Sequence, residues 1–214
     1  CVVSPELDAN DIPDAIEGVD VLVVRSTKVT AQTINRSDRL GLIVRAGAGT
    51  NTIDCQAAAD SGIYVCNVPG TNSVAVAELT LGLLLAVDRH IDTASNDLKG
   101  GTWNKKAYSK ADGLMGKTFA VIGMGEIGLA TAERARSFGM TVVAERKVDR
   151  RPEVEARIRS IGIRLVEDLD TLLRESDIVS LHVPGGAATE NLVDARFLSL
   201  MKPGSILINT SRGE

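Results

Sequence analysis

Residues 119–128 read FAVIGMGEIG, and most of the architecture follows from this stretch. An apolar run of β-forming residues leads into three glycines spaced as G-x-G-x-x-G, and a helical pattern follows at residues 127–138. A second apolar run, at residues 141–144, comes after that helical pattern. A strand, a glycine turn, a helix and another strand in this order predict a βαβ unit with a parallel sheet.

Each glycine of this loop has a physical role in such a unit. Gly123 permits a tight turn, Gly125 lets a pyrophosphate approach the backbone, and Gly128 allows the helix to pack closely on the strand. The first helical residues, Glu126 and Ile127, present free N–H groups and a partial positive charge to that anion. The loop therefore predicts a dinucleotide cofactor, and a glycine turn without a ligand is the alternative.

The end of the next strand bears on which dinucleotide binds. The strand ends in Ala144-Glu145-Arg146-Lys147, where this fold places the residue that contacts the adenosine ribose. Arg146 suits the 2′-phosphate of NADP, with Lys147 as an additional cation, whereas Glu145 could serve the ribose hydroxyls. NAD(H) and NADP(H) both stay open, and Arg146 favours NADP(H). A solvated strand end is the alternative for the two cations.

Apolar runs and helical patterns alternate along the rest of the chain, which predicts an α/β fold. Each apolar run is short and nearly continuous, as expected for a strand that is buried on both faces of a parallel sheet. The predicted strands are residues 20–24, 42–44, 63–66, 118–122, 141–144, 177–181 and 205–208. The predicted helices are residues 54–61, 127–138, 153–161, 169–175 and 194–201.

The alternation breaks once, at a long helical pattern over residues 73–99. A Pro-Gly turn precedes it, so we place a domain boundary there. Residues 1–69 are predicted to form one domain, and residues 70–214 a second domain that the long helix opens. Residues 79–87 are apolar nearly all round, which predicts that the helix is covered on more than one side.

Composition weighs against several classes of protein. The 214 residues are 44% apolar and 24% charged, which is ordinary for a globular chain, and their net charge is −4. Nucleic-acid binders usually have a basic excess and aromatic residues for stacking, but aromatic residues are 3% here. Three cysteines without metal-ligand spacing predict reduced thiols, a cytoplasmic location and no metal site. No apolar run reaches the ~20 residues that span a bilayer, so no membrane partner is expected.

With these motifs the chain resembles the D-isomer-specific 2-hydroxyacid dehydrogenases, and within them the phosphoglycerate dehydrogenase branch. The matching motifs are Val24-Arg25-Ser26-Thr27, Arg45-Ala46-Gly47-Ala48-Gly49, Asn67-Val68-Pro69-Gly70-Thr71-Asn72, Val76-Ala77-Glu78, Trp103-Asn104, the glycine loop, Leu181-His182-Val183-Pro184, Met201-Lys202-Pro203-Gly204 and Asn209-Thr210-Ser211-Arg212-Gly213. The resemblance implies two Rossmann-like domains with parallel sheets: a flavodoxin-like substrate domain and an NAD(P)-binding domain. It also implies hydride transfer between NAD(P) and a small 2-hydroxy or 2-oxo acid, with 3-phosphoglycerate or hydroxypyruvate as the expected substrate.

The resemblance also implies roles for individual residues. Arg212 matches the catalytic arginine, whose planar fork can clamp a carboxylate and polarise the adjacent oxo group. Substrate contacts are implied for Arg25, Ser26, Gly47, Ala48, Gly49 and Asn72. Cofactor contacts are implied for His182, Val183, Pro184, Thr189, Thr210 and Ser211, in addition to the residues of the glycine loop and the strand end. The structural alternatives are a surface ion pair for Arg212, and ordinary turns or helix starts for Arg25, Ser26, the Gly47–Gly49 loop and Asn72.

Neither histidine is expected to supply the proton that accompanies hydride transfer. His90 lies late in the long helix, and His182 ends a strand in a motif that lines the cofactor cleft of the family. The family's catalytic histidine, and the glutamate that orients it, lie beyond the position of Gly213. We therefore expect the chain to be incomplete at its C-terminus, and Glu214 has the wrong spacing to be that glutamate.

Three interpretations of function stay open. The first is an NAD(P)-dependent D-2-hydroxyacid dehydrogenase, which this stretch alone would leave inactive. The second is a dinucleotide-sensing binding module, like corepressors that resemble the same family, and the third is an inert truncated fragment. The resemblance further implies a homodimer that packs through residues 73–99, and Cys66 is expected to be a core thiol.

Overall fold

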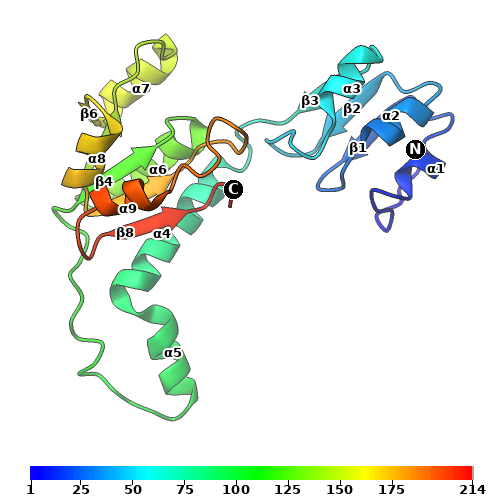
Figure 1. Ribbon diagram of the computed structural model, residues 1–214. Coiled ribbons are helices and arrows are strands. Elements are labelled where there is room, and N and C mark those ends of the chain that lie inside the picture. Colours follow the sequence, from blue (N-terminus) through cyan, green and yellow to red (C-terminus); the bar gives the residue numbers. More distant parts are fainter. Residues whose placement is uncertain (214) are drawn as a thin grey trace. The chain divides into compact units, whose positions relative to one another are not determined.

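The structure is a computed structural model that describes residues 1–213. Contacts within the chain divide it into two units, Cys1–Asn72 and Ser73–Glu214. Each unit contains a parallel sheet with helices, which confirms the predicted α/β fold class (Figure 1). Glu214, which the spacing excluded as the orienting glutamate, lies outside the described residues.

The first unit is built on a three-stranded sheet in the order β1-β2-β3. The strands are β1 (Val21–Val24), β2 (Leu42–Arg45) and β3 (Tyr64–Asn67), and the helices are α1 (Ile12–Ala15), α2 (Ala31–Arg36) and α3 (Cys55–Asp60). Its core gathers aliphatic side chains from all of these layers, including Ile16, Ile34, Ile43 and Ala58. Because the strands are parallel, the residues after β1, β2 and β3 meet at one edge of the sheet.

The second unit is built on a five-stranded parallel sheet in the order β6-β5-β4-β7-β8. The strands are β4 (Thr118–Ile122), β5 (Thr141–Glu145), β6 (Arg164–Val166), β7 (Ile178–Leu181) and β8 (Ile206–Asn209). The helices that follow the strands are α6 (Glu126–Ser137), α7 (Pro152–Ile161), α8 (Leu169–Glu175) and α9 (Ala195–Leu200). The strand order reverses between β4 and β7, which is where ligands bind in open α/β sheets.

Helices bury both faces of this sheet, which explains the nearly continuous apolar runs. Phe119 and Val121 of β4 face the core formed with α4, α6 and α7, whereas Ala120 faces the core formed with α8 and α9. All three side chains are buried. Successive residues of a strand point to opposite faces, so a strand covered on both sides is apolar at most of its positions.

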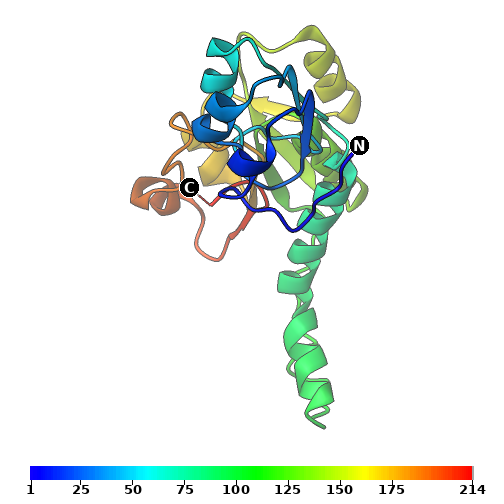
Figure 2. The same cartoon turned by 90° about the vertical axis from the view of Figure 1, so that its right-hand side faces the viewer.

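The predicted single helix over residues 73–99 is wrong. The segment forms two helices, α4 (Ser73–Arg89) and α5 (Ile91–Lys99), and His90 between them has a left-handed backbone with φ 53°. Within the described chain α5 buries none of its residues, and it projects away from the sheet of its unit (Figures 1 and 2). A left-handed histidine carries no sequence signal comparable to glycine or proline, so the break was invisible in the pattern.

The chain covers only one side of α4. Ala77, Leu81 and Leu84 are buried, and the helix contacts α6 and β8. The other side carries the exposed side chains of Leu79, Leu83 and Val87, with Leu79 55% exposed. Within the described residues, the predicted cover on more than one side is therefore absent, and α4 presents an apolar stripe.

Short elements account for most of the other differences from the prediction. Helices α1 and α2 and strand β6 were not predicted, because each has six residues or fewer and too few apolar positions to establish a period. Cys66 was expected in the core, but it is exposed near the end of the edge strand β3. Nothing in the described part of the chain is both long and apolar enough to serve as a membrane-spanning helix.

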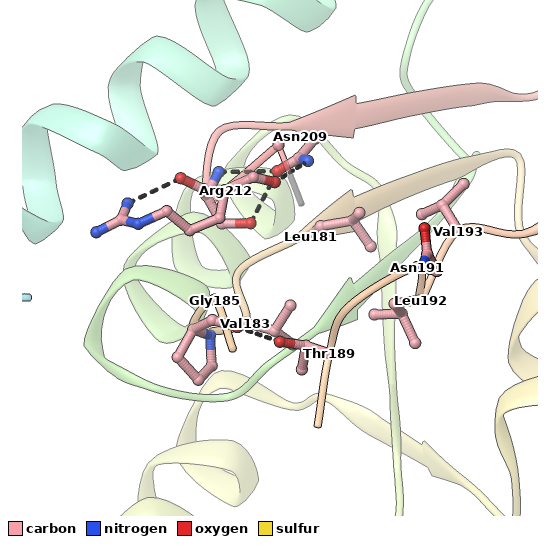
Figure 3. Close-up of a pocket in the computed structure, with 12 residues that line it drawn as sticks. Leu181, Val183, Gly185, Thr189, Asn191, Leu192, Val193, Asn209 and Arg212 are labelled. Atoms are coloured by element: carbon pink, nitrogen blue, oxygen red, sulfur yellow. Dashed lines mark hydrogen bonds between the residues drawn. The ribbon is translucent and has the colours of Figure 1, made fainter. Parts of the chain in front are cut away.

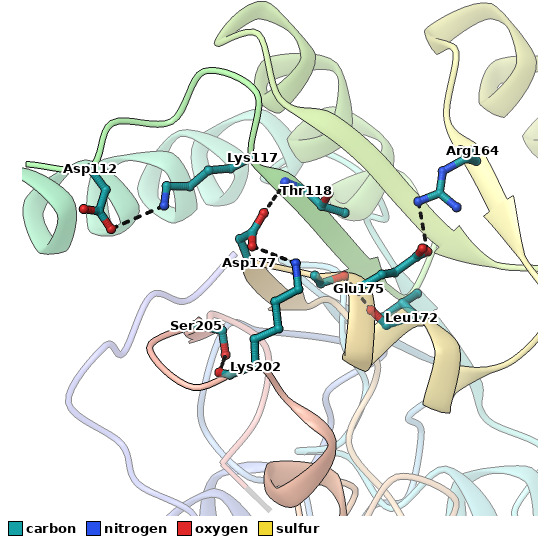
Figure 4. A network of polar contacts seen from close by, with 10 residues as sticks. Asp112, Lys117, Thr118, Arg164, Leu172, Glu175, Asp177, Lys202 and Ser205 are labelled. Carbon is teal, nitrogen blue, oxygen red and sulfur yellow. Dashed lines mark hydrogen bonds and ion pairs between the residues drawn. The ribbon is translucent and has the colours of Figure 1, made fainter.

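Polar contacts tie the amino ends of β4, β7 and β8 together (Figure 4). The carboxylate of Asp177 accepts the backbone N–H of Thr118 at 2.8 Å and the ammonium of Lys202 at 2.8 Å. Partial burial opposes ionisation of Asp177, but the hydrogen bonds from Lys202 and Thr118 outweigh it and lower the pKa. This network lies at the edge of the sheet opposite to the glycine loop, so it is a structural feature.

Candidate active site

Gly123 sits where the loop after β4 passes against the chain that leaves β7. Its φ is +99°, and an added Cβ would collide with the carbonyl group of His182. The backbone of His182 is held in place because its N–H donates to the carbonyl of Ile122 at 2.7 Å. Only glycine fits this position, for reasons of both conformation and space.

The start of α6 leaves room for an anion. Gly125 is the N-cap, and an added Cβ there would meet no atom within 4 Å. An added Cβ at Gly128 would collide with the carbonyl oxygen of Gly123, so the helix lies directly on the loop. No side chain of the described chain caps this helix, and the carboxylate of Glu126 turns to Arg157, 2.9 Å away. The first N–H groups of α6 are thus available to a pyrophosphate.

Two cations follow β5 at the same edge of the sheet. The side chain of Arg146 is 56% exposed, and its Nε lies 3.5 Å from the carboxylate of Glu167. The Nζ of Lys147 lies 3.8 Å from the carboxylate of Glu145. Exposed pairs at these distances are weak, so both cations can turn to a bound phosphate.

The imidazole of His182 is held in a buried, neutral state. Its Nε2 shares a hydrogen bond with the hydroxyl of Ser180 at 2.9 Å. Its Nδ1 is inaccessible to solvent and has no hydrogen-bond partner among the described residues. Burial lowers the pKa of His182 to about 4. The ring is therefore uncharged at neutral pH and has no proton to deliver from an imidazolium form.

A pocket of about 250 Å³ lies beside the carboxyl ends of β7 and β8 (Figure 3). Its lining is partly apolar and partly polar: Leu181, Val183, Pro184, Gly185, Thr189, Asn191, Leu192, Val193, Asn209, Ser211, Arg212 and Gly213. The hydroxyl of Thr189 donates to the carbonyl of Pro184 at 2.5 Å, which closes the loop that follows β7. A pocket with apolar walls and a few convergent polar groups suits an organic ligand.

The loop that carries Arg212 is folded around the side chain of Asn209. The amide Nδ2 of Asn209 donates to the carbonyl of Arg212 at 2.6 Å, and its Oδ1 accepts the backbone N–H of Ser211 at 2.9 Å. The hydroxyls of Thr210 and Thr80 lie 2.9 Å apart, which anchors the loop to α4. The guanidinium of Arg212, in turn, donates to the carbonyl of Ser211 at 2.9 Å. Arg212 thus stands on a braced turn at the pocket wall.

The candidates in the first unit also gather at one edge. Arg25 and Ser26 follow β1, and the Gly47–Gly49 loop follows β2, with the carbonyl of Ala48 accepting the side-chain amide of Asn67 at 2.6 Å. An added Cβ at Gly47 would collide with the guanidinium of Arg45, which fills the space that glycine leaves. Asn72 is exposed immediately before α4. The structure therefore brings together the substrate candidates that follow β1 and β2. Asn72 is not among them, because it lies between β3 and α4.

The chain can now be compared with known proteins. Residues 81–214 match the family described as "D-isomer specific 2-hydroxyacid dehydrogenase, NAD binding domain". The chain belongs to the D-isomer-specific 2-hydroxyacid dehydrogenase family. The glycine loop, the strand ends after β5 and β7 and the pocket beside β8 all lie within the matched NAD-binding domain.

Relatives within the family carry several names. The chain is 44% identical to a hydroxypyruvate reductase of Thermotoga maritima, over 99% of this chain and 67% of that protein. It is 40% identical to a D-3-phosphoglycerate dehydrogenase of Methanocaldococcus jannaschii, over 99% of this chain and 40% of that protein. Among solved structures, an acyclic imino acid reductase in complex with NADPH and D-Arg superposes with a TM-score of 0.83 at 33% identity, covering 97% of this chain and 64% of that one. The chain thus spans about two thirds or less of the length of these dehydrogenases and reductases.

Three residues have structural roles that the sequence did not predict, although Asn209 and Arg45 belong to the matching motifs. Asn209 holds the Arg212 turn, and the pattern Asn-x-Ser was a usable signal because an Asn side chain often bonds the backbone two residues on. Arg45 packs under the Gly47 loop with its Nε buried and without a partner among the described residues. Asn191 lines the pocket with a left-handed backbone of φ 53°. The positions of Arg45 and Asn191 depend on how the chain folds back, which the sequence does not display.

Proposed function

We propose that the full-length protein is an NAD(P)-dependent oxidoreductase that transfers a hydride between the cofactor and a small 2-hydroxy or 2-oxo acid. The observation that carries this proposal is the braced turn that presents Arg212 beside the pocket at the carboxyl ends of β7 and β8. The names of two relatives, hydroxypyruvate reductase and D-3-phosphoglycerate dehydrogenase, support hydroxypyruvate or 3-phosphoglycerate as the substrate. In this proposal residues 1–69 belong to the substrate domain and residues 70–214 to the NAD(P)-binding domain.

In this proposal some residues bind the substrate and the cofactor, and Arg212 also activates the oxo group of the substrate. The dinucleotide, when bound, would supply or accept the hydride at its nicotinamide, and the substrate oxygen would gain or lose one proton with it. The guanidinium of Arg212 clamps the carboxylate of the acid with two parallel hydrogen bonds and polarises the neighbouring oxo group, which makes that carbon a better hydride acceptor. In the first unit, we propose substrate contacts for the Gly47–Gly49 loop and for Arg25, Ser26 and Asn72. His182 stays neutral at the carboxyl end of β7, beside the glycine loop of the proposed dinucleotide site.

The cofactor preference provides the first test. With hydroxypyruvate as the substrate, the full-length protein should oxidise NADPH with a KM about tenfold below that for NADH, because Arg146 and Lys147 can bond the 2′-phosphate. The variant Arg146→Asp should remove or invert this preference, whereas Arg159→Asp, the same charge change on exposed α7, should retain it. Steady-state kinetics with both cofactors measures this, and a lower KM for NADH in the wild-type protein would contradict the proposed preference.

The apolar stripe of α4 supports a proposal about assembly. Leu79, Leu83 and Val87 are exposed on the side of α4 that faces away from its own unit, and α5 extends the helix pair with exposed Leu98. We propose that a second copy of the chain covers these side chains, since an exposed apolar stripe on a helix marks an interaction site. Light scattering of the full-length protein at micromolar concentration should give twice the protomer mass, and Leu83→Asp should lower it. A monomeric wild-type mass would contradict the homodimer.

A further inference from the structure

Two exposed cations, Arg146 and Lys147, stand on the segment that joins β5 to α7, residues 146–151. The backbone N–H of Arg146 donates to the carbonyl of Val166 at 2.7 Å, so the pairing of β5 with β6 extends one residue beyond the strand. In the described part of the chain, the side chains of Arg146 and Lys147 make only long ion pairs, 3.5 Å from Arg146 to Glu167 and 3.8 Å from Lys147 to Glu145. These pairs are too weak to fix where the cations point.

The side chain of Arg150, in the same segment, is largely buried, whereas those of Arg146 and Lys147 are exposed. The side chain of Arg150 is only 9% exposed, and it makes two short contacts. Its Nη2 donates to the carbonyl of Glu145 at 2.7 Å, and its Nη1 donates to the carboxylate of Glu155 at 3.0 Å. Glu145 is the last residue of β5, and Glu155 lies in the first turn of α7. Arg150 therefore bridges the two ends of the segment from its inner side.

The bridge acts on the residue directly before Arg146. A shift of the carbonyl of Glu145 would move the Cα of Arg146 and the direction of its side chain, because the two share one peptide bond. A guanidinium reaches two acceptors in one plane at fixed spacing, which a lysine does not. The carboxylate of Glu155 compensates the charge of Arg150, so the cations of the segment that stay exposed are Arg146, Lys147 and Arg151, and the first two directly follow the carbonyl that Arg150 holds.

We propose that Arg150 is a positioning residue that sets how strongly this site discriminates between NADPH and NADH, acting through Arg146 and Lys147. Arg150 itself need not touch the cofactor. The inference rests on the proposed function, because it takes the carboxyl edge of the second sheet as the place where the dinucleotide binds.

The test is a comparison of dissociation constants for NADPH and NADH in the full-length protein, measured by cofactor fluorescence. In Arg150→Met, NADPH binding should weaken about tenfold while NADH binding changes less than twofold, so the ratio of the two constants falls about tenfold. Arg150→Lys should recover only part of the ratio, because lysine keeps the charge but loses the two-pronged bridge. Glu155→Gln leaves Arg150 in place with its hydrogen bond to the carbonyl of Glu145, so it should disturb the fold least and lower the ratio only a few-fold.

A matched control separates positioning from stability. Arg164 of β6 pairs with Glu175 of α8 at 2.9 Å, so Arg164→Met breaks a more exposed arginine–glutamate pair away from the segment and should leave the ratio unchanged. Equal weakening of both cofactors in Arg150→Met and Glu155→Gln, or an unchanged ratio, would overturn the role of Arg150. Wild-type protein that binds neither cofactor would overturn the proposed function and this inference together, whereas a wild-type preference for NADH would overturn only the NADPH preference.

Discussion

Replacing Arg212 with lysine should lower kcat/KM for hydroxypyruvate by about 10² to 10³, the usual cost of removing one donor that stabilises charge in a transition state. Lysine keeps the positive charge, but its ammonium cannot form two parallel bonds to a carboxylate while it polarises the adjacent oxo group. The turn around Asn209 would remain, because Asn209 bonds the backbone of Arg212 and Ser211 and not the guanidinium. The loss should therefore appear in the chemical step and in substrate binding.

Two further measurements make this result specific. The dissociation constant for NADPH should change less than threefold in Arg212→Lys, because the glycine loop and the strand end after β5 lie on other elements. Arg196→Lys provides the matched control, since Arg196 is an exposed arginine on α9 that pairs with Asp170 at 2.6 Å. It should retain wild-type kcat/KM. Near-normal turnover in Arg212→Lys would refute the catalytic role.

Much of the fold could be predicted because it follows from local patterns of adequate length. Strands buried on both faces, such as β4 and β7, appear as apolar runs that few other structures produce. The split between α4 and α5 could not be predicted, because the left-handed turn falls on His90, a residue type that does not signal a turn as glycine or proline does. Strand β6 was not predicted, because its three residues form no recognisable pattern and the strand depends on its pairing with β5.

The same distinction between local patterns and contacts made on folding applies to the residues of the candidate site. The glycine loop could be proposed from the sequence because its chemistry is tied to the turn after a strand, and Arg212 because it matches a family motif at the end of another strand. The role proposed for Arg150 has no such sequence signal, because it rests on contacts of the side chain with the end of β5 and the start of α7. Arg45 likewise matters through the space that Gly47 leaves for its guanidinium. Contacts of this kind exist only after the chain has folded.

The variant Gly123→Ala should have the largest effect on the cofactor site. Alanine at φ +99° pays a backbone cost of about 1–2 kcal/mol for a left-handed conformation. In addition, its Cβ would collide with the backbone carbonyl group of His182. That backbone is held in place because the N–H of His182 donates to the carbonyl of Ile122. The loop and the chain after β7 must then separate, which disturbs both walls of the proposed dinucleotide site.

We expect Gly123→Ala to weaken NADPH binding by at least about 100-fold, that is by roughly 2.7 kcal/mol, and to lower the melting temperature by several degrees. Two other glycines separate the causes. Gly113→Ala has a comparable φ of +78° but an open Cβ position, so it reports the backbone cost alone, whereas Gly125→Ala has neither a positive φ nor a collision. Gly125→Ala should therefore have the highest melting temperature of the three variants, Gly113→Ala an intermediate one and Gly123→Ala the lowest. If Gly123→Ala melts and binds NADPH as the wild-type protein does, the close approach of the loop to His182 does not shape the cofactor site.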